Sequence, residues 1–278
     1  MDFTWYESLL YGLVSGLTDI LPVSAQAHRM LLLKLFGEDA DLSLMRLFIH
    51  AGVLGAVYFH CQPHIVRILR AKRLSRIPKR RRKRPLDTKS LMDYSLWKTM
   101  LVPVILSFFL YGKVQKLESS LVWTAVLILV NGLILYIPQF FPGSNKDSRL
   151  LSRVEGLLMG LGGAIAILPG ISGVGASVSI ANICGVDRSY GLTMTLLMNI
   201  AIQVGLIVYD VMNVVNFSLM GYTFGIILNC MLSGIASFIG TYLGIRFMRN
   251  LAVDKDYSVF AYYCWGAALF TFVLNLMA

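Results

Sequence analysis

Residues 12–24 read GLVSGLTDILPVS, an apolar stretch with a GxxxG motif followed by a break that contains proline and serine. A GxxxG motif lets two helices pack closely in lipid, whereas proline removes a backbone donor and interrupts a helix. Residues 156–172 read GLLMGLGGAIAILPGIS and repeat this order about half a chain later. The sequence therefore predicts two similar units, each of which opens with a helix that breaks inside an apolar segment.

The composition of the 278-residue chain is typical of an integral membrane protein. Hydrophobic residues make up 56% of it and charged residues only 14%, whereas a soluble domain is about 25% charged. The mean hydropathy is +0.68. The apolar windows lack the polar stripe that a soluble helical bundle requires. By length and polarity, we expect transmembrane spans at 42–66, 95–112, 119–141, 190–212, 222–245 and 258–277.

The two broken segments are poorly suited to a single straight span. Non-helical backbone is tolerated at membrane depth only where protein or a water-filled cavity covers it. We therefore expect each break to be the tip of a re-entrant helical hairpin, which enters the membrane and returns to the same side. The predicted fold class is all-α integral membrane, with six transmembrane helices and two re-entrant hairpins. Within this single membrane domain the first repeat covers about 8–141 and the second about 155–277.

The distribution of charge predicts the orientation of the chain. Three spans follow each hairpin, and because three is odd the second repeat is inverted relative to the first. The segment from Arg67 to Lys89 carries twelve Lys and Arg residues, and between two spans such a run marks a cytoplasmic loop near anionic lipid rather than a nucleic-acid site. With the basic loop 67–94 inside, the N-terminus and the acidic segment 37–41 lie outside. A few basic residues run against this trend, namely Arg29, Lys34, Lys113 and Lys116.

Inverted repeats with broken helices place a binding site where the breaks meet near the membrane midplane. Asp19 and His28 flank Pro22, so a bend could turn them toward each other. Such a pair could act as base and orienter, or hold a cation. The alternative is a capping aspartate and a histidine that is satisfied by backbone carbonyls. Burial of both residues without a partner or a use costs several kcal/mol, which favours function.

The second break is rich in serine and glycine, with Ser172, Gly173, Gly175 and Ser177 close together. Backbone N–H groups beside a helix N-terminus form a nest that binds anions. A phosphate group would suit such a turn. Flexible helix packing is the alternative interpretation of the same residues.

Both breaks resemble the signatures of a known family. Residues 15–28 read SGLTDILPVSAQAH and are similar to EGLTEFLPVSSTGH, the first signature of the undecaprenyl pyrophosphate phosphatase family of the bacitracin-resistance type. Residues 168–177 read LPGISGVGAS and resemble its second signature, LPGTSRSGAT. The order of the other spans also matches, so the resemblance covers nearly the whole chain.

The resemblance implies a bacterial inner-membrane protein whose site is accessible from the outer face. Family members remove the terminal phosphate of undecaprenyl pyrophosphate, the C55 lipid carrier of cell-wall synthesis, with a divalent cation such as Mg²⁺ or Ca²⁺. Some members form homodimers, and none of this involves nucleic acid. The catalytic residues implied are Asp19, His28 and Ser24, with Asp19 also as the metal ligand. The phosphate-binding residues implied are Thr18, Gln26, Ser172, Gly173, Gly175 and Ser177.

The match is incomplete at the charged positions of the signatures. Their first glutamate is Ser15 here, their second is Asp19, and their arginine is Gly173. A guanidinium neutralises phosphate charge as the transition state develops, and removal of such a group costs on the order of 10²–10³ in rate. Another basic residue, such as Arg153 or Arg188, could replace it only if the fold brings that residue to the site.

Two functions therefore remain open from the sequence. In the first, the protein is a phosphatase with Asp19 as cation ligand or acid and His28 as base or nucleophile. In the second, it is a catalytically inactive homologue that binds or translocates polyprenyl phosphate, which an inverted repeat also allows. A polybasic scaffold on the membrane is disfavoured, because it leaves the two repeated breaks unexplained.

The predicted orientation is tested by a cysteine introduced at Arg81, within the basic run. Because positively charged loops stay in the cytoplasm, we expect this cysteine to react with a membrane-impermeant thiol reagent only after the cells are opened. Labelling of intact cells would contradict the inverted topology.

Overall fold

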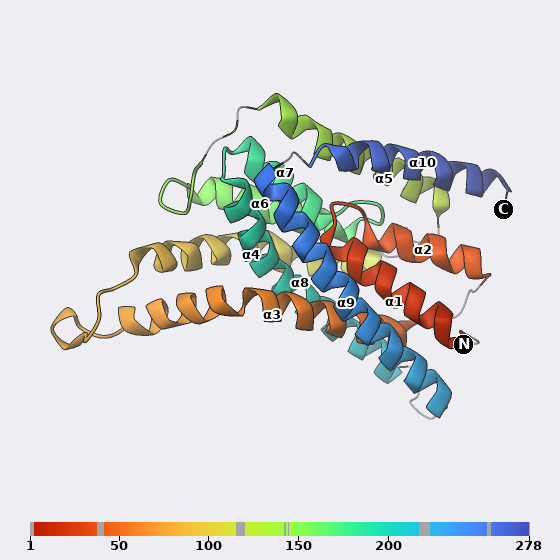
Figure 1. Ribbon diagram of the computed structural model, residues 1–278, viewed down its shortest axis with the longest axis horizontal. Coiled ribbons are helices and arrows are strands. Elements are labelled where there is room, and N and C mark those ends of the chain that lie inside the picture. Colours follow the sequence, from red (N-terminus) through yellow and green to blue (C-terminus); the bar gives the residue numbers. More distant parts are fainter. Residues whose placement is uncertain are drawn as a thin grey trace.

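The computed structural model describes residues 3–37, 42–114, 120–141, 143, 145–216, 223–254 and 257–277. The predicted acidic outer segment 38–41 and Lys116 lie outside these residues. The regular structure of the described residues is helical, with an isolated bridge between Lys146 and Val186. Figure 1 shows the helices packed as a bundle in which α5 and α10 lie side by side along one edge.

Six of the described helices are long and apolar enough to cross a membrane. Each coincides with a predicted span, so the prediction of a multi-pass membrane protein is confirmed. Large apolar side chains point outward from them, such as Phe109, which is 78% exposed, and Phe224, which is 81% exposed. An apolar surface of this extent suits lipid. The six helices are α3 (Ser43–Ser75), α4 (Thr88–Val114), α5 (Leu121–Tyr136, which a 3₁₀ turn extends to Phe140), α8 (Arg188–Asn216), α9 (Phe224–Asp254) and α10 (Val259–Met277).

The helices on either side of the basic segment are longer than predicted. The expected loop 67–94 is only partly a loop, because α3 continues to Ser75 and α4 begins at Thr88. Lysine and arginine are good helix formers, so the charges that stop membrane insertion do not stop the helix. Figure 1 shows α3 and α4 running together to the connecting segment at the far left.

The four remaining α-helices form two pairs of short helices. In the first pair, residues 21–24 separate α1 (Trp5–Ile20) from α2 (Ala25–Phe36). In the second pair, a 3₁₀ turn and residues 168–172 separate α6 (Arg153–Ala164) from α7 (Gly173–Ile183). The chain is thus non-helical at both predicted breaks. These four helices have between 11 and 16 residues, fewer than the roughly 20 that a span requires.

The two pairs begin with the same local interactions. Thr4 caps α1 and Ser152 caps α6, and each forms a capping box with a glutamate three residues later. Such a box satisfies two backbone donors at the helix start. After each break a serine caps the next helix, since Ser24 accepts the N–H of Ala27 and Ser172 accepts that of Gly175. The repeated sequence therefore gives a repeated local structure.

Both GxxxG motifs lie where two helix backbones touch. A Cβ atom added to Gly12 or Gly16 of α1 would lie 2.1 Å from a carbonyl oxygen of α9. A Cβ atom added to Gly160 of α6 would lie 2.2 Å from the carbonyl oxygen of Met100 in α4. The close packing that these motifs predicted is confirmed.

Replacement of Gly16 by alanine tests this packing. The added methyl group meets the α9 backbone, which cannot move aside as a flexible side chain would, so we expect the free energy of unfolding to fall by about 1–3 kcal/mol. The matched control is Gly266→Ala, because a Cβ atom there has no heavy atom within 4 Å. Thermal unfolding in detergent measures both variants, and equal melting temperatures would contradict the prediction.

Candidate functional site

The two breaks are hydrogen-bonded to each other. The Gly170 N–H donates to Ser24 Oγ at 3.0 Å, across a sequence separation of 146 residues. The hydroxyl of Ser172 donates to the carbonyl oxygen of Leu21 at 3.2 Å. The backbones also approach closely, since a Cβ atom on Gly175 would lie 2.9 Å from the Cβ atom of Pro22. The structure thus brings together the two segments that the sequence analysis singled out.

Asn131 of α5 bridges the same two breaks. Its side-chain N–H donates to the carbonyl oxygen of Pro22 at 3.1 Å, and its Oδ1 accepts the N–H of Ser172 at 2.9 Å. Asn131 is fully buried, and in a membrane interior a non-helical backbone group needs such a partner. Asn131 was not among the residues predicted from the sequence, although a polar side chain inside an apolar span is itself a signal.

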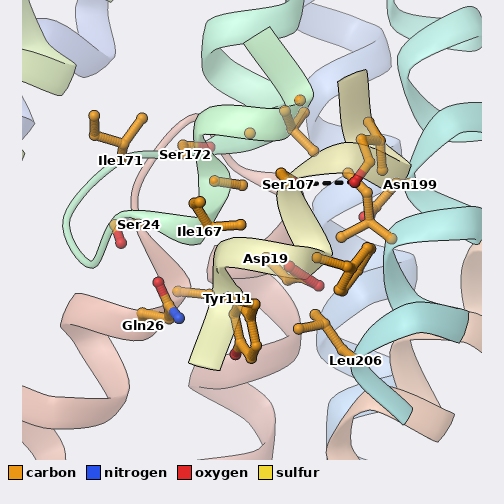
Figure 2. A pocket seen from close by; sticks show the side chains of 18 of the residues that line it. Asp19, Ser24, Gln26, Ser107, Tyr111, Ile167, Ile171, Ser172, Asn199 and Leu206 are labelled. Atoms are coloured by element: carbon orange, nitrogen blue, oxygen red, sulfur yellow. Dashed lines mark hydrogen bonds between the residues drawn. The ribbon is translucent and has the colours of Figure 1, made fainter. Parts of the chain in front are cut away.

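A cavity lies beside the joined breaks, between both helix pairs, α4 and α8. Figure 2 shows Asp19 and Gln26 from the first pair, Ser172 from the second pair, Tyr111 from α4 and Asn199 from α8 around it. The first turns of α2 and α7 border the cavity, and a helix N-terminus favours negative charge. The polar residues that line it are Asp19, Ser24, Gln26, Arg29, Ser107, Tyr111, Ser172 and Asn199.

Asp19 is the one acidic residue among the described residues that line this cavity. Gln203 of α8 donates from Nε2 to Asp19 Oδ2 at 2.5 Å and to Asn199 Oδ1 at 3.3 Å. Two buried atoms next to Asp19, Gln203 Oε1 and Asn199 Nδ2, have no hydrogen-bond partner within the described part of the chain. Buried polar atoms of this kind mark the place of a water molecule or a ligand group.

Arg29 of α2 also lines the cavity, with only 9% of its surface exposed. It lies close enough to Asp19 for their charges to interact. No hydrogen bond or close ion pair joins its guanidinium to another residue in the described ranges. In the sequence, Arg29 stood out only as an exception to the charge distribution, although an ionisable residue inside an apolar segment is a signal of function.

Some of the predicted site residues line the cavity and others do not. Those that line it are Asp19, Ser24, Gln26, Ser172 and Gly173. The hydroxyl of Thr18 instead donates to the carbonyl of Val14 within its own helix, at 2.7 Å. Ser177 is fully buried and shares a hydrogen bond with Thr195 at 3.0 Å. Their direct roles in phosphate binding, like that of Gly175, stay predictions.

His28 is not brought to Asp19. Its Nδ1 lies 2.6 Å from the carbonyl oxygen of Ser24, and its Nε2 lies 2.6 Å from the hydroxyl of Tyr263 in α10. It is absent from the described residues that line the cavity. Both ring nitrogens therefore have partners, of which one is a backbone carbonyl, as the structural alternative expected, and the other is a tyrosine hydroxyl. The catalytic role of His28 stays a prediction.

Arg153 and Arg188, the basic residues considered as replacements for the missing arginine, lie away from the cavity. Each begins a helix, α6 or α8. The first lining residues of these helices are Gly163 and Asn199, about 15 Å further along the axis at 1.5 Å per residue. Neither arginine lines the cavity.

A second buried ionisable group lies further along α8. Asp210 Oδ2 is 2.7 Å from Nδ1 of His50 in α3, and Asp210 Oδ1 is 3.6 Å from Nε of Arg46. His50 is also close enough to Asp19 for an electrostatic interaction. Burial of charge in a membrane protein is costly without pairing, and here the pairing joins α3 to α8. This cluster was not predicted from the sequence, because its members are far apart in the chain.

These features define a multi-pass membrane protein with a partly charged cavity between two broken helix pairs. The chain matches the family model described as bacitracin resistance protein BacA over residues 8–270, and it belongs to that family, as its two signatures indicated. It is 30% identical over 277 residues to the undecaprenyl-diphosphatase of Methanobrevibacter smithii, covering 96% of each chain. It is 28% identical to the undecaprenyl-diphosphatase of a Nocardioides species, covering 96% of this chain and 95% of that one. It is 26% identical to that of Thermosipho africanus, covering 96% and 99%.

Replacement of Asn131 by alanine tests the bridge between the breaks. The change leaves the Ser172 N–H unpaired and leaves the Pro22 carbonyl with only the long contact from Cys264 Sγ at 3.9 Å, so we expect the free energy of unfolding to fall by about 1–3 kcal/mol, as for the loss of two membrane hydrogen bonds. The control is Leu129→Ala on the same helix, where the side chain is 47% exposed. Chemical unfolding in detergent compares the two, and an Asn131→Ala variant as stable as the control would contradict the bridge.

Proposed function

We propose that this protein is an undecaprenyl-diphosphatase, which hydrolyses undecaprenyl pyrophosphate to undecaprenyl phosphate and inorganic phosphate. The observation that carries the proposal is the cavity at the joined breaks, where half-buried Asp19 and the first turns of α2 and α7 line the same space. Membership of the family supports it, because the relatives compared above are named for this activity.

The lining of the cavity suits a lipid diphosphate. Helix N-termini at α2 and α7 favour the anionic head group. The apolar part of the lining includes Val104 and Phe108 of α4 with Leu206 of α8, which suits the isoprenoid units next to the diphosphate. A cavity with an apolar wall and a few convergent polar groups is typical of a small-molecule site.

In the proposed reaction, water attacks the terminal phosphorus and the bond to the bridging oxygen breaks. Asp19 accepts the proton of the attacking water, since Gln203 holds one of its oxygens in place and a positioned carboxylate is an effective general base. The bridging oxygen leaves on undecaprenyl phosphate. Ser24 Oγ already accepts the N–H groups of Ala27 and Gly170, so its own O–H is available to donate to a phosphate oxygen.

The residues of the cavity fit a divalent cation that is shared with the substrate. Within the described residues there is no cluster of three or more His, Cys, Asp or Glu side chains that could hold a metal by itself. Mg²⁺, however, is commonly bound by one or two carboxylates together with phosphate oxygens. Asp19 would supply one carboxylate, in the role of cation ligand rather than of base, and the diphosphate would supply the remaining charge. A cation bound in this way would neutralise charge on the phosphate oxygens.

We also propose that the helix pairs are re-entrant hairpins in inverted repeats, with bounds of about 8–141 and 155–277. The capping boxes and the GxxxG contacts support this arrangement, because α1 packs on α9 and α6 packs on α4. In each case the first helix of one repeat meets the fourth helix of the other. In an inverted repeat a pseudo-two-fold axis relates the two halves. Such an axis would map the contact of α1 with α9 onto the contact of α6 with α4.

The orientation follows from the basic segment, which we place in the cytoplasm of an inner-membrane protein. The α4 residues that line the cavity, from Val104 to Tyr111, belong to the half of α4 that is distant from this segment. The cavity would therefore open toward the outer face, where we propose that the lipid diphosphate enters.

Phosphate release from undecaprenyl pyrophosphate by the purified protein in detergent, with and without Mg²⁺ or Ca²⁺, tests the proposal. We expect Asp19→Asn to lower the rate by at least about 10²-fold, because a general base contributes 10²–10⁴-fold. Asp19→Glu should retain more activity, since it keeps the carboxylate. No release by the unchanged protein, with undecaprenyl phosphate still bound, would favour the carrier function instead.

His28→Ala belongs in the same assay as a comparison. Because His28 is bonded to Ser24 and Tyr263 outside the cavity lining, we expect its loss to reduce the rate by no more than about 10-fold, through the position of α2. A loss as large as that of Asp19→Asn would give His28 the role of base or nucleophile.

A further inference from the structure

We propose that Arg29 of α2 binds the diphosphate group and supplies the positive charge that the second break lacks at Gly173. This inference rests on the proposed function, because it concerns the same cavity. Arg29 follows the last residue of the first signature, so neither signature assigns it a role.

The first step is that residue 173 has no room for a side chain in this fold. A Cβ atom on Gly173 would lie 2.6 Å from the Cβ atom of Ala166 and 3.1 Å from the carbonyl oxygen of Gly163. The neighbouring atoms are a methyl carbon and a backbone oxygen, and neither can rotate out of the way as the end of a flexible side chain can. A guanidinium therefore has to reach the cavity from another element.

Arg29 is the one basic residue among the described residues that line the cavity. It lies five positions after Ser24, which caps α2 beside the second break. Side chains of a helix lean toward its N-terminus, so that of Arg29 leans back toward Ser24 and the joined breaks. Arg29 and Gly173 thus border one cavity from opposite breaks.

The guanidinium of Arg29 lacks an acceptor in the described part of the chain. A guanidinium has five N–H donors. The interaction between Asp19 and Arg29 is electrostatic, without a hydrogen bond between the two side chains. Burial of a charged group without hydrogen bonds is costly, whereas a phosphate would accept two parallel N–H bonds from the planar fork. A buried arginine held in this way is a preorganised phosphate-binding group.

The kinetic test compares Arg29→Gln with Lys34→Gln, which removes a basic residue from an exposed position on the same helix. We expect Arg29→Gln to lower kcat/KM for undecaprenyl pyrophosphate by about 10²–10³-fold and Lys34→Gln to change it by less than about 2-fold. Arg29→Lys keeps the positive charge but loses the planar guanidinium, so its kcat/KM should lie between those of Arg29→Gln and Lys34→Gln. Arg29→Gln with wild-type kinetics would overturn the inference.

Chemical rescue separates phosphate binding from a role in folding. In Arg29→Ala the removed side chain leaves space for a free guanidinium ion. We expect millimolar guanidinium chloride to raise the rate of Arg29→Ala by at least about 10-fold, whereas sodium chloride at the same concentration should not raise it. If neither salt restores activity and Arg29→Lys is as inactive as Arg29→Ala, Arg29 serves only the structure and the inference fails.

A binding experiment separates phosphate contact from neutralisation of Asp19, and it does not require turnover. The affinity for undecaprenyl phosphate is measured in Asp19→Asn, with and without Arg29→Gln. If Arg29 contacts phosphate, its loss still weakens binding by at least about 10-fold when Asp19 is neutral. If Arg29 only neutralises the charge of Asp19, its loss does not change the affinity in the Asp19→Asn protein, and the inference is overturned. Because this readout holds even for a protein without hydrolysis, failure of the proposed function and failure of this inference are distinguishable.

Discussion

The hydrogen bonds between the two broken helices are the constraint on which the rest of this structure depends. Each break exposes backbone groups that have no helical partner, and a buried backbone group without a hydrogen bond costs free energy. Gly170 therefore donates to Ser24, Ser172 donates to Leu21, and Asn131 binds both breaks at once. Neither break could lie inside the bundle alone, because each supplies the partners of the other.

The same contact determines where the polar cavity forms. Helices that begin at a break direct their N-termini to it, so the joining of two breaks brings the starts of α2 and α7 together. The glycines of α1 and α6 let these helices approach α9 and α4 within backbone contact, which fixes the depth of both breaks. The positive ends of two helix dipoles, the half-buried carboxylate of Asp19 and the buried guanidinium of Arg29 thus lie in one place. The packing that stabilises the fold also builds the site.

The sequence predicted the features that depend on local chemistry. Apolar windows gave the six spans, and proline with glycine and serine gave the two breaks. It could not show which faces of distant helices meet, so Asn131 and the pairing of His50 with Asp210 were missed. The length of α3 was also underestimated, because arginine and lysine end a membrane span without ending a helix. The position of His28 beside Tyr263 depends on the packing of α10, which no local pattern reveals.

The relation between Gly173 and Arg29 shows why a signature is an incomplete guide to chemistry. A signature records which sequence position carries a group, but a phosphate responds only to where the charge lies in space. Because both breaks border one cavity, a guanidinium can reach the head group from either of them. The packing of α7 on Gly163 and Ala166 leaves no space for a side chain at Gly173, whereas Arg29 lies buried at the other break. Loss of a charged residue from one motif therefore does not imply loss of the charge from the site.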